Sequence, residues 1–128
     1  MLVLTLTTTI FNAVVFAQVY PSKTTRIMVG AAPGGGTDVI ARMLAEKFAE
    51  SMQQTFVVDN RPGASNTIAA EIAARAVPDG HTVLLATNTG QAIAPHLLKL
   101  GFDTLRDLHP IGLITAVPHV LLVSSQET

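Results

Sequence analysis

Ala32-Pro33-Gly34-Gly35-Gly36-Thr37-Asp38 is the stretch of sequence that decides the predicted fold. It follows an apolar run, 26–31, and precedes a segment, 39–52, in which apolar side chains recur every three or four residues. That spacing is typical of an amphipathic helix, so the predicted order is strand, glycine loop, helix. Consecutive glycines let the backbone turn sharply and approach a ligand closely. The helix start, with unpaired N–H groups at the positive end of its dipole, makes the loop a candidate anion site.

The alternation of strand and helix patterns continues along the chain. It predicts an α/β fold with a mainly parallel sheet flanked by helices, in which right-handed crossovers connect the strands. Each strand is rich in β-branched or apolar residues, and each helix carries a periodic apolar face. Strands are expected over 23–31, 55–59 and 81–87, helices over 39–52 and 67–76, then a short helix over 92–100 and two strand-like runs at 111–115 and 120–124.

Three polar loops are predicted to meet at one edge of this sheet. They cover 32–38, 60–66 and 87–91, and they are rich in Gly, Ser, Thr and Asn. In open parallel sheets, ligands bind beyond the carboxyl ends of the strands, where these loops fall. None of the loops carries a His–carboxylate pair, so the sequence predicts a binding edge without catalytic residues.

The composition excludes several classes of function. The 128-residue chain is 48% hydrophobic and 13% charged, with a net charge of −1 and no cysteine. Near-neutral charge without a basic run argues against nucleic acid as a partner, and the lack of cysteine leaves no thiol nucleophile or Cys-based metal site. The four histidines are scattered without metal-ligand spacing, so neither a metal nor a cofactor is expected.

The first residues of the chain predict export. Residues 1–22 carry no charged side chain, and Ala17 with Val15 two positions before it fits a signal-peptidase site. Residues 1–17 are therefore interpreted as a signal peptide, and the remainder, 18–128, as an extracytoplasmic domain. The segment lacks a basic n-region apart from the terminal amine, and it is too short and too rich in Thr for a permanent membrane span.

Five motifs in order carry a resemblance to a known family. Each motif alone is weak, but together they are specific. The chain resembles the periplasmic solute-binding proteins of tripartite tricarboxylate transporters, the Bug or TctC family. The motifs are Tyr20-Pro21-Ser22-Lys23, Pro33-Gly34-Gly35-Gly36-Thr37-Asp38, Asn60-Arg61-Pro62-Gly63-Ala64, Pro78-Asp79-Gly80-His81-Thr82, and Phe102-Asp103 with Asp107-Leu108.

The resemblance implies a type II periplasmic-binding-protein-like fold of two α/β lobes. Because it covers only the N-terminal portion of the family, 18–128 are expected to form an incomplete N-terminal lobe. The implied protein is not an enzyme. It is expected to be a monomeric receptor that captures a small carboxylate, such as a di- or tricarboxylate, an aromatic acid or an amino acid, by lobe closure. It then delivers this solute to membrane subunits of the transporter.

The candidate ligand-binding residues come from the three loops. Gly36 or Thr37 is expected to cap the first helix, and Thr37 and Asp38 either serve only that helix or line the cleft. Ser65 to Thr67 likewise either cap the following helix or donate to the ligand, and they stand where the family pattern reads Gly-Gly-Asn. The candidates are Pro33, Gly34, Gly35, Gly36, Thr37, Asp38, Ala64, Ser65, Asn66, Thr67, Thr87, Asn88 and Thr89.

Other hypotheses remain open from the sequence. Arg61 is either a bidentate carboxylate clamp or a surface residue that orders its loop. A Rossmann-like nucleotide-binding enzyme domain is suggested by Gly34-x-Gly36 after a strand and by Asp59 at the ribose-binding position, although Val39 replaces the third glycine of that motif. The third possibility is a truncated fragment without activity.

Overall fold

The computed structural model describes residues 20–118, 120 and 122. The predicted signal peptide over 1–17 lies outside the described residues. Most of the strand-like run expected over 120–124 also lies outside them.

The centre of the fold is a three-stranded sheet in the order β2-β1-β3. Its strands are β1 (Thr25–Val29), β2 (Phe56–Asn60) and β3 (Thr82–Leu85), and β1 pairs in parallel with both neighbours. The register places Thr25 opposite Phe56, and Arg26 opposite Thr82. The predicted parallel sheet is thus confirmed, and all of its carboxyl ends lie at the same edge.

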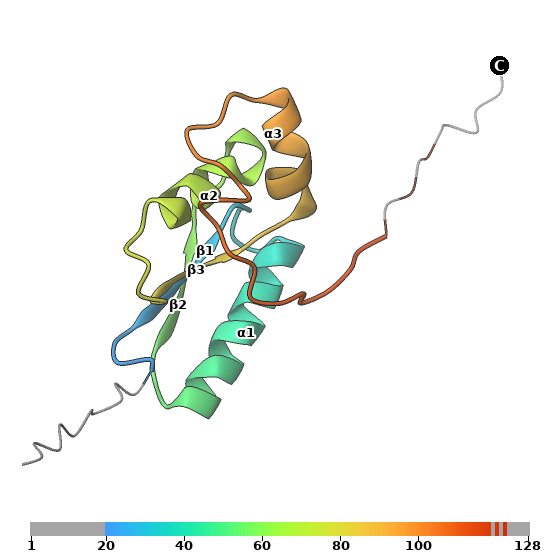
Figure 1. The fold of residues 1–128 in the computed structure, drawn as a ribbon. Helices are drawn as coiled ribbons and strands as arrows, with labels where there is room; N and C mark the ends of the chain where they lie inside the picture. Colours follow the sequence, from blue (N-terminus) through green and yellow to red (C-terminus); the bar gives the residue numbers. More distant parts are fainter. Residues whose placement is uncertain (1–19, 119, 121, 123–128) are drawn as a thin grey trace, which may run out of the picture.

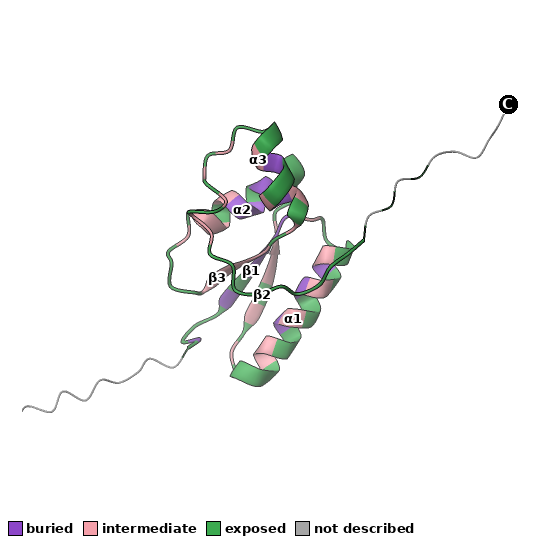
Figure 2. Ribbon diagram, turned by 45° about the vertical axis from the view of Figure 1, so that its right-hand side comes forward, coloured by how far each residue is buried: buried purple, intermediate pink, exposed green. Residues whose placement is uncertain are grey.

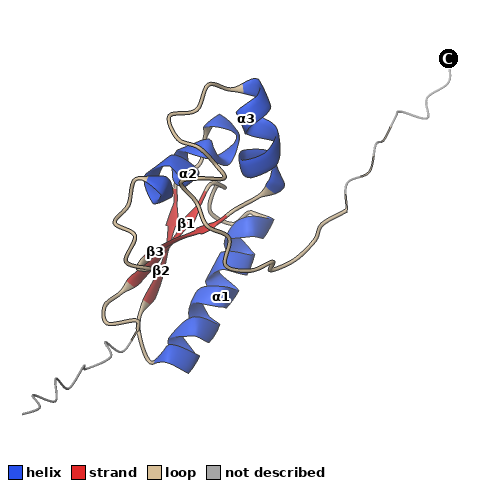
Figure 3. Cartoon of the chain, in the orientation of Figure 1, coloured by secondary structure: helices blue, strands red, loops and turns tan. Residues whose placement is uncertain are grey.

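Helices cover both faces of this sheet (Figures 1 and 3). The long helix α1 (Gly36–Met52) packs against β1 and β2, whereas α2 (Thr67–Ala74) packs against β1 and β3. A chain that moves outward from β1 to β2, and then back across to β3, places its two crossover helices on opposite faces when both crossovers are right-handed. The predicted helices over 39–52 and 67–76 are confirmed.

The central strand is buried on both faces (Figure 2). Ile27 and Val29 pack with Ala41 and Ala45 of α1, and Phe48 joins this cluster at its margin. Successive side chains alternate between sheet faces, so Met28, which is fully buried, lies on the α2 side. Burial on both faces explains the apolar run over 27–29 in β1, and this packed strand supports the three loops at the carboxyl edge.

Two expectations for the C-terminal third are wrong. The run 111–115 is exposed extended chain, because no strand among the described residues pairs with it and the prolines at 110 and 118 remove ladder donors. The helix expected over 92–100 is shorter. A wide π-type turn, Thr89–Ile93, leads into α3 (Ala94–Leu97), where Pro95 occupies the first turn. Between residues 20 and 118, no helix is long and apolar enough to cross a membrane.

Candidate functional site

The three predicted polar loops converge at the carboxyl edge of the sheet. The first joins β1 to α1, the second joins β2 to α2 through a single helical turn (Ala64–Asn66), and the third follows β3. Parallel strand order alone requires this convergence, which is why the sequence could predict it.

The start of α1 has an open N-terminus. Gly35 is the N-cap residue, with φ −74° and ψ 163°, and no side chain caps the helix. The expectation that Gly36 or Thr37 provides the cap is therefore wrong. Side chains added at Gly34 or Gly36 would meet open space, so no neighbouring residue packs against the backbone at these two positions at the start of α1. The N–H groups of a helix start, with the helix dipole, suit an anion.

Asp38 anchors this loop from within the fold. Its carboxylate is buried and accepts hydrogen bonds from Arg42 Nε, Gly34 N and Asn60 Nδ2, each at 2.9 Å. The Arg42 hydrogen bond, with those from Gly34 and Asn60, lowers the pKa of Asp38 to about 2. Asn60 also donates to the carbonyl of Ala31 at 3.0 Å. The charged carboxylate thus fastens the glycine loop to the end of β2.

The second loop is strained. Ala64, Ser65 and Asn66 have φ values of 44°, 55° and 72°, so three successive residues with side chains adopt left-handed backbone. The Thr67 hydroxyl donates to the Ala64 carbonyl at 2.7 Å. Asn66 is the N-cap residue of α2, but its side chain makes no capping hydrogen bond. Instead, its Nδ2 donates to Thr87 Oγ1 at 3.0 Å and ties the second loop to the third.

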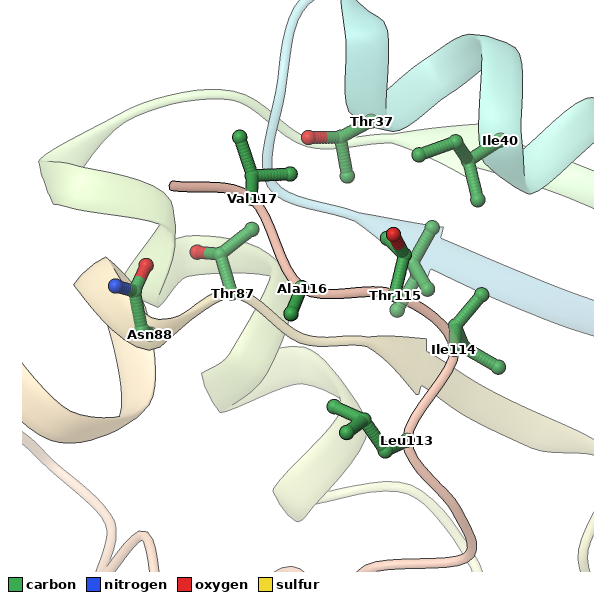
Figure 4. Close-up of a pocket in the computed structure, with 10 residues that line it drawn as sticks. Thr37, Ile40, Thr87, Asn88, Leu113, Ile114, Thr115, Ala116 and Val117 are labelled. Atoms are coloured by element: carbon green, nitrogen blue, oxygen red, sulfur yellow. The ribbon is translucent and has the colours of Figure 1, made fainter. Parts of the chain in front are cut away.

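A pocket of about 350 Å³ lies between the first and third loops (Figure 4). Of the predicted residues, Thr37, Thr87 and Asn88 line it. Sequence reasoning missed Ile40, Leu85 and the extended segment Leu113–Val117, which runs past Thr37 and Thr87. Ile40 could have been found, because it lies one helical turn after Thr37 on the same face. Nothing in the apolar sequence of 113–117 predicts that it returns to this edge.

The other predicted residues do not line the pocket. Asn88 Oδ1 accepts from the Thr89 amide at 2.9 Å, which shapes the third loop. The remaining candidates lie in the connection from β1 to α1, in the turn between β2 and α2, in the first turns of α1 and α2, and in the turn after β3: Pro33, Gly34, Gly35, Gly36, Asp38, Ala64, Ser65, Asn66, Thr67 and Thr89.

Arg61 does not line this pocket. Its Nε donates to Asp59 Oδ1 at 2.8 Å, and Arg26 donates to the same carboxylate. These interactions, with Arg26 as the strongest, lower the pKa of Asp59. The geometry matches the interpretation of Arg61 as a residue that orders its loop. It also leaves the Asp59 carboxylate engaged with two guanidinium groups rather than free for a ribose. Among the described residues, no group of three or more His, Asp or Glu side chains could hold a metal ion.

Fold and edge together define an α/β lobe with hydrogen-bond donors gathered at the carboxyl ends of parallel strands. The sequence model of the TctC family, described as the tripartite tricarboxylate transporter family receptor, matches residues 40–127. The chain belongs to this family, as its motifs predicted, and the family is described as a receptor family.

Relatives with curated sequences agree with this assignment. A UPF0065 protein of Bordetella bronchiseptica is 40% identical over 111 residues, which are 86% of this chain and 33% of that protein. Protein BugT of Bordetella pertussis is 36% identical over 114 residues, 88% of this chain and 35% of BugT. The chain spans about a third of the length of the curated relatives that it matches.

Solved structures confirm the predicted fold. MatC of Rhodopseudomonas palustris, solved with bound malate, is 34% identical with a TM-score of 0.65, over 69% of this chain and 30% of MatC. Rpa4515 of R. palustris, solved with adipate, is 38% identical with a TM-score of 0.53, over 54% of this chain and 23% of that protein. A further chain, described as a periplasmic transporter, is 42% identical with a TM-score of 0.64, over 68% of this chain and 30% of its own length.

Proposed function

We propose that the whole protein is the periplasmic solute receptor of a tripartite tricarboxylate-type transporter and that it binds a small carboxylate. One observation carries the proposal. The uncapped start of α1 and the side chains of Thr37, Thr87 and Asn88 lie at the same edge of the sheet, around one pocket. Hydroxyl, amide and backbone N–H donors, with a helix dipole behind them, complement a carboxylate. MatC and Rpa4515 were solved with carboxylates, which supports this class of solute.

The remainder of the proposal follows the family. Residues 1–17 act as the export signal, and 18–128 form the N-terminal lobe of a monomeric receptor. This lobe grips the carboxylate, and a second lobe closes over the rest of the solute, so that the closed form is recognised by membrane subunits. The protein performs no chemistry on the solute and needs no cofactor.

The proposal is tested by isothermal titration calorimetry of the whole protein with adipate, malate and a panel of mono- and tricarboxylates. The discriminating variant is Gly35→Asp. At an N-cap, Asp accepts hydrogen bonds from the helix N–H groups. The carboxylate introduced at position 35 therefore occupies the N–H groups that would otherwise bind the solute carboxylate, and it repels that carboxylate. The backbone of Gly35, at φ −74°, accommodates any residue, although a Cβ would approach the Ala32 carbonyl to 3.3 Å.

The matched control is Gly35→Asn, which has nearly the same shape without the charge. We expect the wild-type protein to bind at least one carboxylate, and Gly35→Asp to bind it at least tenfold more weakly than Gly35→Asn, while both variants unfold at similar temperatures. The absence of binding by the wild-type protein to every carboxylate in the panel overturns the proposal.

A further inference from the structure

Asn66 lies where the three loops meet. A Cβ atom added to Gly30, at the end of β1, would be 2.6 Å from the Cβ of Asn66 and 2.8 Å from its Cα. On the other side, a Cβ added to Gly90 in the third loop would be 3.4 Å from the Cβ of Asn66. Asn66 is therefore held between two glycines, one from each neighbouring loop. Its left-handed backbone, with φ 72°, directs the side chain toward the third loop.

The side chain of Asn66 determines how the Thr87 hydroxyl is used. Asn66 Nδ2 donates to Thr87 Oγ1 at 3.0 Å, and the Gly90 amide donates to the same oxygen at 3.4 Å. A hydroxyl has two acceptor lone pairs and one donor hydrogen, so these contacts occupy both lone pairs. Within the part of the chain that the structure describes, no hydrogen bond takes up the hydrogen of this hydroxyl, and Thr87 lines the pocket.

We propose that Asn66 is a positioning residue that fixes the Thr87 hydroxyl as a donor into the pocket, so that the site selects a carboxylate oxygen over an amide N–H group. The inference rests on the proposed function and adds the residue that sets the polarity of the site.

The composition of the pocket makes the direction of the Thr87 hydroxyl important. Its described lining contains no Lys or Arg, so this lobe can favour an anion only through oriented dipoles. A hydroxyl that is free to rotate presents its hydrogen to a carboxylate or a lone pair to an amide with similar ease. A hydroxyl that already accepts two hydrogen bonds offers only its hydrogen, and an amide N–H group placed against it remains unpaired. Unpaired buried donors are unfavourable.

The test is a double-mutant cycle in the whole protein, with malate, adipate and the monoamide of each as titrants in calorimetry. Thr87→Val removes the hydroxyl and keeps the shape, and Thr87→Ser restores the hydroxyl. Asn66→Gly removes the donor and accepts a left-handed backbone without strain. We expect at least tenfold weaker dicarboxylate binding for Thr87→Val and near wild-type binding for Thr87→Ser. Asn66→Gly should weaken dicarboxylate binding three- to tenfold, with a much smaller change for the monoamide.

In the Thr87→Val background, Asn66→Gly should have no further effect on affinity. If Asn66→Gly lowers the affinity for the dicarboxylate and for its monoamide equally, the role of Asn66 is merely structural and the inference is overturned. The same holds if Asn66→Gly still lowers dicarboxylate affinity in the Thr87→Val background. If Asn66→Gly fails to fold, Asn66→Asp replaces it in the same cycle. This variant keeps the shape of the Asn66 side chain, and its carboxylate accepts the hydrogen of the Thr87 hydroxyl. The ratio of monoamide to dicarboxylate affinity should therefore rise relative to wild type. The rise should be smaller in the Thr87→Val background, where the hydroxyl is absent. Failure of the wild-type protein to bind any carboxylate instead overturns the proposed function, and the inference with it.

Discussion

The strained turn between β2 and α2 predicts that one substitution to glycine stabilises the protein. Ser65 has φ 55° and ψ 40°, its side chain is exposed, and the hydrogen bonds of this turn are made by its neighbours Asn66 and Thr67. Ser65→Gly therefore changes the backbone preference at this position while it leaves those contacts in place.

The magnitude follows from two opposing effects. A left-handed backbone costs a residue with a Cβ atom about 1–2 kcal/mol, and glycine avoids this cost. Glycine also gains conformational freedom in the unfolded chain, which lowers stability by roughly 0.5–1 kcal/mol. The strain term is the larger, so we expect Ser65→Gly to raise the free energy of unfolding by about 0.5–1 kcal/mol.

The assay is urea unfolding of the whole protein, followed by far-UV circular dichroism, with Ser51→Gly as the matched control. Ser51 is also exposed but lies in the right-handed backbone of α1, so its replacement by glycine should lower stability by about 0.5 kcal/mol. A Ser65→Gly variant that loses as much stability as Ser51→Gly would refute the reasoning, since it would show that the left-handed turn is not strained.

Three further predictions concern the carboxyl edge. Gly30→Ala should lower the free energy of unfolding by about 1–3 kcal/mol in the same urea assay, because the new methyl group meets the Cα and Cβ atoms of Asn66; an unchanged value would contradict this packing. Arg61→Ala should change carboxylate affinity less than threefold in calorimetry, because Arg61 pairs with Asp59; a loss of 30-fold or more would restore the clamp hypothesis. The carboxylate of Asp38, with its pKa lowered from 3.8 to about 2, stabilises the folded state above pH 3.8, and this contribution should disappear as the pH falls toward 2. Thermal unfolding of Asp38→Asn should therefore depend less on pH across this window than that of the wild-type protein.

The sequence predicted the parts of the fold that depend on local pattern. Alternating strands and helices require a parallel sheet with its loops at one edge, and that arrangement places Thr37, Thr87 and Asn88 around one pocket. The family motifs predicted the membership that the comparisons confirm. Each of these conclusions needs only the order of elements along the chain and the residue types within them.

What the sequence could not predict depends on contacts between distant residues. Helical spacing indicates Glu46 as a partner for Arg42, whereas in the fold Arg42 donates to Asp38, which also accepts from Gly34 and Asn60. The apolar pattern of 111–115 predicts a strand, but a strand needs a neighbour, and none lies beside it in the described residues. The left-handed backbone at Asn66 was compatible with its residue type, yet its hydrogen bond to Thr87 emerges only from the packing of three loops.

The central claim is that the carboxyl edge of this lobe binds a carboxylate through donors rather than through a cationic side chain. The most direct measurement is calorimetric titration of the whole protein with malate and adipate, in parallel for wild type, Gly35→Asn and Gly35→Asp. The account predicts binding to the wild-type protein and a selective loss in Gly35→Asp, at least tenfold relative to Gly35→Asn. Equal affinities of the two variants would place the solute elsewhere and contradict the account.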